Sequence, residues 1–506
     1  MNDTRAASER AGDDRRAAVI VLAFLAARAA FAAVVGFGVD ESYTLAIART
    51  LNLSYFDHPP LHQWIAHVAA AALAEGFGAR LPFLLLFAAT GWLIYRLTSA
   101  LFGSRAGLIA LFALNAAPFF FASAGSWIVP DGPLLFGLAL AAWALARAFF
   151  ADADAGGGEG LPAWLIAGLG FGLAGLSKYS AVLSGLGVLA FIALSPRQRF
   201  WLARPAPYAA AALAVAMTAP VFLWNARHDW ASFAFQGARG AAESGLKPAQ
   251  LLQMALGQVA YLSPWLFVPL VLGLIAAARR PDDDRRRLLL WLALPAILLF
   301  TLTPLWGARG LPHWTMPGWL FAFPLMGAWL DGTNISDRAL RRGAAASAVL
   351  LAVLAAAAAT QAATGWPLRA LSQGSDPTLE AFDWRALRDA PLMNPPPAFV
   401  VAISWSDAGK IAMALGPDVP VFVASYDPRG WAFVDGEAAV PGRNGVVIAR
   451  AAEAALARIV AQPLFAELGP AQVVTLRRNG APAVDLVLIP ASSLTRPLPL
   501  PYPARR

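Results

Sequence analysis

The feature that most constrains this chain is a series of apolar runs long enough to cross a lipid bilayer. A transmembrane helix needs about 20 apolar residues, and only a closed hydrogen-bonding pattern such as a helix is stable in hydrocarbon. Of the 506 residues, 58% are hydrophobic and only 14% are charged, against about 25% charged in soluble proteins. Eleven candidate runs lie at 17–37, 81–98, 106–123, 132–150, 162–177, 181–195, 206–224, 251–277, 288–303, 314–330 and 343–363. The chain is therefore predicted to be a polytopic α-helical membrane protein with about 11 spans, the first of them retained.

The distribution of arginine predicts the orientation in the membrane. The connections near 96–105, 147, 197–204, 279–287 and 338–342 hold most of the loop arginines, and basic loops stay in the cytoplasm. The N-terminus is then inside, and the segment 364–506 is outside. The net charge of +8 fits short cytoplasmic loops better than nucleic-acid binding. The sequence has no cysteine, which excludes disulfides and thiol chemistry.

A polar stretch follows the first span and contains the first candidate catalytic residues. Helical spacing at 41–52 and 61–74, interrupted by Pro59 and Pro60, predicts two interfacial helices at about 40–78. Asp40 and Glu41 stand at the mouth of the span, where acids need water around them. They could act as a general base and its hydrogen-bonding or metal-binding partner. The alternative is that Asp40 caps the next helix.

Two further acids occur at predicted turns on the outer side. Asp57 and His58 precede the two prolines, and the alternative interpretation is a turn that only redirects the chain. His58 and His62 are four residues apart, but the intervening prolines make a helical metal pair doubtful. Asp131 directly precedes the run 132–150. It either caps that helix or supplies a second carboxylate to the cavity that Asp40 and Glu41 are expected to line.

Basic residues on the outer side are candidates for binding phosphate. Lys178 lies between two apolar runs of a chain that has only three lysines. It supplies a compact charge suited to phosphate, or it snorkels to the interface. The other lysines, Lys247 and Lys410, have no evident role.

Two tryptophan-flanked outer segments hold the remaining candidates: Arg227, His228, Arg309 and His313. Arginine recognises phosphate groups well. Aromatic residues at a membrane interface are expected in any case.

Composition changes after the last apolar run. Residues 364–397 are rich in Pro, Asp and Trp and are predicted to be a linker after a transmembrane domain of 1–363. Strand-like runs at 398–403, 419–425, 445–450 and 484–490 alternate with helix-like runs at 406–415 and 451–462. This alternation predicts a small extracytoplasmic α/β domain. It has no Gly-rich dinucleotide motif, and no cofactor is assigned to it.

The ordered set of motifs resembles a known group of enzymes. Asp40-Glu41 after the first span, Phe56 to Pro60 as Phe-Asp-His-Pro-Pro, Asp131 at the start of the fourth span and Lys178 in the next outer turn are similar to the GT-C membrane glycosyltransferases. The resemblance is to the bacterial group related to protein O-mannosyltransferases and lipid A aminoarabinose transferases (glycosyltransferase family 39-like), and it covers roughly 1–330. It implies a polyprenyl-phosphate sugar donor and a glycan, lipid or protein acceptor at the outer face of the bacterial inner membrane.

The resemblance also implies roles for residues. Asp40 corresponds to the catalytic base of an inverting transfer, and Glu41 positions either Asp40 or the acceptor. Asp57, His58 and Asp131 complete the cavity. A divalent metal ion is left open as a cofactor, with Asp40, Asp131 and His58 as candidate ligands. Lys178 and an outer arginine neutralise the leaving lipid phosphate. The residues Ser-Tyr-Thr after Glu41 depart from the family pattern, in which an Arg or aromatic-rich run is often seen. The resemblance therefore does not assign the acceptor contacts in this region.

Two other functions use the same sequence features. A lipid or solute transporter with an outer domain would show repeated halves and helices broken at mid-membrane, and no repeat is evident in the sequence. An outer-face hydrolase of lipid-linked phosphates would use the same residues with water as acceptor.

Overall fold

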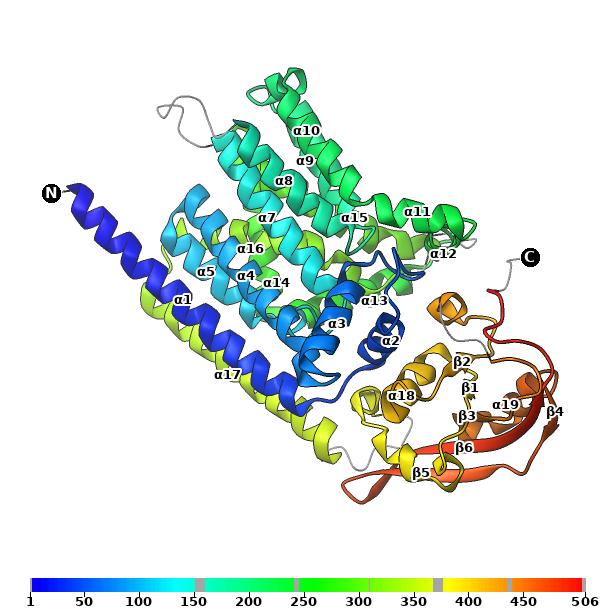
Figure 1. Ribbon diagram of the computed structural model, residues 1–506. Coiled ribbons are helices and arrows are strands. Elements are labelled where there is room, and N and C mark those ends of the chain that lie inside the picture. Colours follow the sequence, from blue (N-terminus) through cyan, green and yellow to red (C-terminus); the bar gives the residue numbers. More distant parts are fainter. Residues whose placement is uncertain are drawn as a thin grey trace. The chain divides into compact units, whose positions relative to one another are not determined.

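The chain divides into two compact units (Figure 1). The computed structural model describes residues 2–150, 160–240, 245–308, 310–366, 376–434 and 439–502. The helical unit consists of residues 1–29, 58–62 and 81–352. The sheet unit consists of residues 30–57, 63–80 and 353–506. The interfacial segment after the first span therefore groups largely with the C-terminal domain, which differs from the predicted division at 363.

Helices make up nearly all regular structure of the helical unit. Apolar runs fold as helices because burying apolar side chains is favourable only when the backbone satisfies its own hydrogen bonds. The helices that lie wholly or partly in this unit are α1 (Asn2–Val34), α4 (Phe77–Phe102), α5 (Ser104–Ala116), α6 (Pro118–Ser126), α7 (Asp131–Phe150), α8 (Gly160–Gly175), α9 (Ala181–Leu194), α10 (Pro205–Met217), α11 (Ala219–Arg227), α12 (Ala231–Arg239), α13 (Pro248–Leu262), α14 (Pro264–Ala278), α15 (Asp284–Leu302), α16 (Met316–Asp331) and α17 (Asp337–Thr364).

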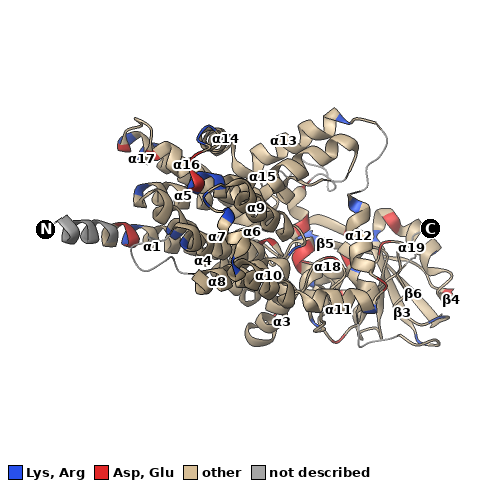
Figure 2. Cartoon of the chain, turned by 90° about the horizontal axis from the view of Figure 1, so that it is seen from above, with Lys and Arg blue, Asp and Glu red and all other residues tan. Residues whose placement is uncertain are grey.

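Every predicted apolar run is helical, but not every run is one straight span. Within the described residues, five helices are long and apolar enough to cross a membrane: Ala11–Val34, Phe77–Phe102, Asp131–Phe150, Asp284–Trp306 and Asp337–Thr364. Three bent pairs raise this number to as many as eight if each pair is one span. Helices α8 and α9 are shorter apolar helices. The protein is a multi-pass membrane protein, and its long helices are mostly tan in Figure 2, the colour of residues other than Lys, Arg, Asp and Glu.

The bent pairs correct three of the predicted runs. The run 106–123 breaks between α5 and α6 with a bend of 73°, and the run 206–224 breaks between α10 and α11 with a bend of 41°. The run 251–277 bends by 105° between α13 and α14. In each pair the second helix has a proline in its first turn, where its missing N–H and fixed φ suit a new helix start. Hydropathy alone does not detect these breaks.

Small residues bring helices α7, α8 and α10 close together. α8 packs against both α7 and α10. A Cβ added to Gly170 of α8 would lie 2.6 Å from Ala141 N of α7, and one added to Gly168 would lie 2.5 Å from the Ala210 carbonyl oxygen of α10. Close packing of small side chains stabilises helices in lipid, where the hydrophobic effect between them is absent.

The charge within the first span is held by aromatic rings. Arg28 is 1% exposed and its guanidinium carbon lies 4.5 Å from the centre of the Phe87 ring and 5.3 Å from that of Phe121. Its Nη2 donates to the carbonyl of Phe120 at 3.5 Å. Arg28 therefore packs inside the helical unit and does not snorkel, and the cation–π contacts offset part of the cost of its burial.

The sheet unit combines two helices from the N-terminal third of the chain with a C-terminal α/β domain. Its helices are α2 (Val39–Ala48), α3 (Leu61–Leu73, the first two residues of which belong to the helical unit), α18 (Trp405–Leu415) and α19 (Ala454–Ala461). Its strands are β1 (Val400–Ala402), β2 (Val421–Val423), β3 (Gly445–Arg450), β4 (Phe465–Leu468), β5 (Gln472–Arg478) and β6 (Ala481–Leu494). All predicted strands and helices of the domain are present, whereas β4 and β5 were not predicted.

The strands form one mixed sheet. The order is β2-β1-β3-β6-β4, with β5 also paired to β6. β1 is parallel to β2 and β3, and β6 is antiparallel to β3, β4 and β5. Residues that alternate along β1 face opposite sides, as strand geometry requires. One face packs with α18 and α2, and the other packs with α19.

The predicted linker is a folded part of the sheet unit where the structure describes it. Three short 3₁₀ helices occur at Pro377–Ala381, Arg385–Asp389 and Pro391–Met393. Trp384 and Leu387 are buried in the core formed by α2, α18 and the sheet. The prediction of a linker is therefore wrong for 376–397, while 367–375 lie outside the described residues. The Pro-rich composition reflects 3₁₀ turns that contribute apolar side chains to a core.

Candidate active site

Helix α2 carries the Asp-Glu pair and starts one residue before Asp40. Gly38 is the N-cap, and its N–H donates to Glu41 Oε2 at 3.0 Å. Asp40 lies in the first turn with its side chain exposed. The alternative that Asp40 is the N-cap is therefore wrong, although an acid in the first turn is favoured by the helix dipole.

Glu41 is buried in an ion pair that ties three segments of chain together. Arg80, at the start of α4, donates from Nε to Glu41 Oε1 at 2.7 Å and from Nη2 to Oε2 at 2.5 Å. The two side chains are 2% and 1% exposed. The remaining Arg80 protons reach the carbonyls at the end of α1, those of Ala32, Val35 and Gly36, at 2.6, 2.6 and 2.9 Å. With both oxygens engaged, Glu41 is suited to positioning α2 and not to accepting a substrate proton.

Asp57 is held by partners that the sequence did not indicate. Tyr43, three residues after Asp40, donates its hydroxyl to Asp57 Oδ2. Arg429 Nη1 lies 3.4 Å from Asp57 Oδ1, and the N–H of Gly430 donates to the Tyr43 hydroxyl at 2.9 Å. Burial, reinforced by the Asp57 charge, raises the pKa of Tyr43 well above its usual value, so the phenol stays protonated. The departure at Ser-Tyr-Thr thus includes a residue that orients Asp57.

The helical unit holds a second polar group around Lys178. Lys178 lies in the turn between α8 and α9 and donates to both oxygens of Asp131 at 3.0 and 3.2 Å. Both side chains are buried, and Asp131 is the first residue of α7. Lys178 therefore does not snorkel. A substrate phosphate at Lys178 would share this ammonium with Asp131.

Two histidines complete the group around the Asp131–Lys178 pair. His62, in the first turn of α3, is 1% exposed, and burial lowers its pKa to about 3 despite the nearby charge of Asp131. Burial, reinforced by Lys178, lowers the pKa of His313 to about 4. Both imidazoles are neutral at physiological pH and can act only as neutral donors or acceptors there. His62 was not among the predicted site residues; its spacing from Asp57 and His58 was the available signal.

The turn at Pro59 and Pro60 brings His58 and His62 to this group. The N–H of Leu61 donates to the carbonyl of Leu176 at 2.8 Å, which fixes the start of α3 against the end of α8. The rings of His58 and His62 lie edge to face with centres 5.8 Å apart. The prolines prevent helix before Leu61, so the two histidines do not form the i, i+4 pair of one helix.

The other predicted basic residues are distributed differently. His313 stacks on Phe119 with ring centres 6.4 Å apart. His228 stacks on Trp224 at 4.2 Å and its Nδ1 contacts the carbonyl of Trp224 at 2.8 Å, while Arg227 is exposed at the end of α11. Of these, only His313 lies in the group of Asp131 and Lys178. Arg309 lies outside the described residues.

The acids and histidines do not form a metal centre. Within the described ranges, no group of three or more His, Asp or Glu side chains is placed to hold a metal ion. Of the candidate ligands Asp40, Asp131 and His58, Asp131 already binds Lys178 through both of its oxygens. Divalent cations need several oxygen or nitrogen ligands around one point. The side chains as arranged do not fit such an ion.

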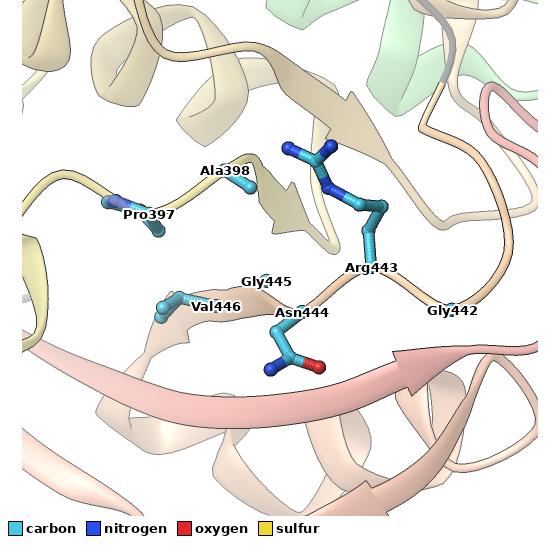
Figure 3. Close-up of a pocket in the computed structure, with 7 residues that line it drawn as sticks. All are labelled: Pro397, Ala398, Gly442, Arg443, Asn444, Gly445 and Val446. Carbon is cyan, nitrogen blue, oxygen red and sulfur yellow. The ribbon is translucent and has the colours of Figure 1, made fainter.

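The pocket drawn in Figure 3 lies elsewhere, at the edge of the sheet where β3 starts. It is lined by residues 397–398 and 442–446 and has a volume of about 450 Å³. Arg443 is its only charged lining residue, and Asn444 accepts from the N–H of Ser493 at 2.9 Å. Without an acid or histidine in its lining, this pocket is not the candidate active site.

The fold is of the GT-C membrane type with a C-terminal sheet domain. The structure aligns with ArnT from Cupriavidus metallidurans bound to undecaprenyl phosphate with a TM-score of 0.63 at 15% identity, covering 93% of this chain and 97% of that one. The apo state of the same protein aligns with a TM-score of 0.62 over the same fractions. At this identity the likeness establishes the fold.

Sequence comparison points to the same group. Residues 57–224 match the family described as dolichyl-phosphate-mannose-protein mannosyltransferase, a range that includes Asp57, His58, Asp131 and Lys178. Lipid A galacturonosyltransferase RgtD of Rhizobium johnstonii (strain DSM 114642 / LMG 32736 / 3841) is 26% identical over 305 residues. That match covers 58% of this chain and 60% of the relative's length. The resemblance deduced from the motifs is thus confirmed.

Proposed function

We propose that this protein is an inverting glycosyltransferase of the bacterial inner membrane. It moves a sugar from a polyprenyl-phosphate donor to a glycan, lipid or protein acceptor at the outer face. The similarity to RgtD and the family match at 57–224 support this activity, and ArnT, of the same fold, binds undecaprenyl phosphate.

The observation that carries the proposal is the buried Lys178–Asp131 pair with its neutral histidines. A leaving lipid phosphate gains negative charge as the bond to the sugar breaks, and a fixed cation in a water-poor site stabilises that charge. Lys178 supplies the cation, and its hydrogen bonds to Asp131 hold it in place before the donor binds. Because His62 and His313 are neutral, the group carries no excess charge of its own.

The chemistry assigns the proton to Asp40. The acceptor hydroxyl attacks the anomeric carbon opposite the phosphate, the new C–O bond forms, and the old C–O bond breaks with its electron pair passing to the phosphate. Asp40 takes the hydroxyl proton. Its carboxylate is exposed in the first turn of α2 and can meet a substrate, and both oxygens of the buried Glu41 are bonded to Arg80. This scheme does not require a metal ion, and among the residues that the structure describes no group of three or more His, Asp or Glu side chains is placed to hold one.

The outer location rests on the arginine distribution. The connections predicted to be cytoplasmic hold Arg279, Arg280 and Arg285 to Arg287 among others, and the sheet unit is assigned to the opposite side. A reporter that is active only in the cytoplasm, fused after Arg506, should be silent. Activity of that reporter would reverse the orientation and place the proposed transfer on the wrong face.

The decisive experiment is sugar transfer in membranes. Wild-type protein with a defined polyprenyl-phosphate sugar should transfer the sugar and release polyprenyl phosphate, while matched membranes without the protein should not. Mass spectrometry of lipid extracts from cells with and without the protein should identify the modified acceptor. Release of free sugar with no modified acceptor would instead establish the hydrolase. Unchanged donor together with movement of a lipid or solute across the membrane would establish the transporter.

A further inference from the structure

Helix α18 of the C-terminal domain approaches α2 closely enough to require glycine. A Cβ added to Gly409 would lie 2.7 Å from Tyr43 N and 2.9 Å from Tyr43 Cα. Those distances are shorter than van der Waals contact to backbone atoms that cannot move aside. The two helices therefore pack backbone to backbone next to the first turn of α2, which contains Asp40.

Lys410, the residue after Gly409, fixes the chain that leads into α2. Its Nζ donates to the carbonyls of Phe37 and, at 3.1 Å, of Phe382. Phe37 immediately precedes the N-cap Gly38. The lysine is 5% exposed, and a buried ammonium is costly unless it is hydrogen-bonded. The lysine is buried although its ammonium donates to backbone carbonyls, which indicates that it holds the segment leading into α2 in place.

A turn of the same domain fixes the other end of the segment. Arg429 has a φ of +51°, an unfavourable conformation for a residue with a side chain. The turn brings Gly430 so close that a Cβ there would lie 2.3 Å from the Tyr43 hydroxyl. The guanidinium carbon of Arg429 lies 4.0 Å from the centre of the Trp405 ring, and its Nη1 lies 3.4 Å from Asp57 Oδ1. Strained backbone of this kind concentrates at functional sites.

We propose that the C-terminal α/β domain is a positioning part of the catalytic centre. Lys410 holds the entry to α2, Arg429 and Gly430 hold Tyr43 and Asp57, and the segment from Phe37 to Asp57 that carries Asp40 is thereby fixed from both ends. All of these groups belong to the sheet unit. The inference rests on the proposed function, because it assigns Asp40 to proton transfer.

The geometry explains why the domain cannot be a loosely attached accessory. A displacement of about 1 Å in a reacting group can reduce the rate about 10²-fold. Removing Lys410 or Arg429 frees one end of the segment while leaving Asp40 itself intact. The expected defect is therefore in kcat, with the donor KM nearly unchanged.

The test uses the full chain in membranes and compares Arg429→Gln, Arg429→Lys and Lys410→Met with wild type. Arg429→Gln and Lys410→Met should reduce the kcat per folded protein about 10- to 100-fold, a loss larger than the fall in thermal midpoint that follows from removing the cation next to the buried Asp57 carboxylate. Arg429→Lys should recover part of the activity because it retains a cation opposite Asp57. Arg477→Gln is the matched control: it alters an exposed arginine of the same domain that bonds only to a hairpin carbonyl, and it should be fully active.

Tyr43→Phe keeps the core packing and removes only the hydroxyl between Gly430 and Asp57, so it tests the contact without an altered charge. Its kcat should fall as in Arg429→Gln. The inference is overturned if the wild type is active and both Arg429→Gln and Lys410→Met keep the wild-type kcat. Losses of kcat that only match losses of folded protein would do the same. An inactive wild type with every tested donor would instead count against the proposed function itself.

Discussion

Arg80 is the residue whose removal should disturb the sheet unit most. Its five N–H groups meet five acceptors, two oxygens of Glu41 and three carbonyls at the end of α1. Arg80→Met leaves the buried Glu41 carboxylate without its counter-charge. Breaking a buried ion pair from one side costs about 3–5 kcal/mol, which is a large share of the about 5–15 kcal/mol that stabilises a typical protein.

Two further variants separate the charge from the geometry of Arg80. Arg80→Lys keeps the charge, but an ammonium has three donors for five acceptors, so a smaller loss of stability is expected. Glu41→Gln combined with Arg80→Met leaves no buried carboxylate at position 41 and should be more stable than Arg80→Met alone. The difference between the double variant and the sum of the singles measures the pair's coupling.

The assay is denaturant unfolding of the purified full chain in detergent, followed by far-UV circular dichroism and tryptophan fluorescence. Near-equal free energies of unfolding for wild type and Arg80→Met, within about 0.5 kcal/mol, a range typical of surface substitutions, would refute the argument. Strict additivity in the double variant would show that the two side chains do not interact energetically.

Three other predictions address the site. Asp40→Asn should fold normally and lose about 10²–10⁴-fold in transfer rate, measured with a defined donor lipid; retention of most activity would exclude Asp40 as the base. Lys178→Ala should destabilise the helical unit by about 3–5 kcal/mol, because it strands the buried Asp131 carboxylate, contrary to the intact folding expected of an interfacial lysine. Lys178→Ala with Asp131→Asn should recover stability but not donor use, and recovered donor kinetics would exclude the phosphate role of Lys178. The pKa of His62 is about 3 in the folded protein against about 6.5 in the unfolded chain, so the unfolded state binds the extra proton. The contribution of His62 to stability is therefore complete above pH 6.5 and falls as pH decreases toward 3, by about 3 kcal/mol at pH 4. The melting temperature in detergent should depend less on pH in His62→Gln than in wild type, and equal pH dependence would contradict the assignment.

The mutational consequences of Lys178 and Lys410 could not be deduced from their sequence neighbourhoods. Lys178 is flanked by apolar runs, which fits both an interfacial and a buried lysine, and its partner Asp131 is 47 positions away. Lys410 lies in an unremarkable amphipathic helix, yet it reaches a carbonyl 373 positions away. Pairing across such separations depends on how the helices pack.

Local sequence by itself determined the helices, most of the strands and the class of protein. Each apolar run in 17–363 is helical because hydrocarbon requires internal backbone hydrogen bonds, and prolines 59 and 60 mark the start of α3 at Leu61 because proline cannot continue a helix. Strands β4 and β5 were missed since they are partly exposed edge elements without a continuous apolar run. The ordered acids, histidines and lysine were sufficient to indicate the enzyme family.

Only the tertiary structure decided which of those groups act together and what supports them. Glu41 is committed to Arg80, Asp57 to Tyr43 and Arg429, and Asp131 to Lys178. The bends at prolines 118, 220 and 264 and the grouping of α2 with the C-terminal domain also belong to this level. The physical reason is that an ion pair or a glycine contact between distant segments depends on close packing in three dimensions, which no local pattern of residues encodes.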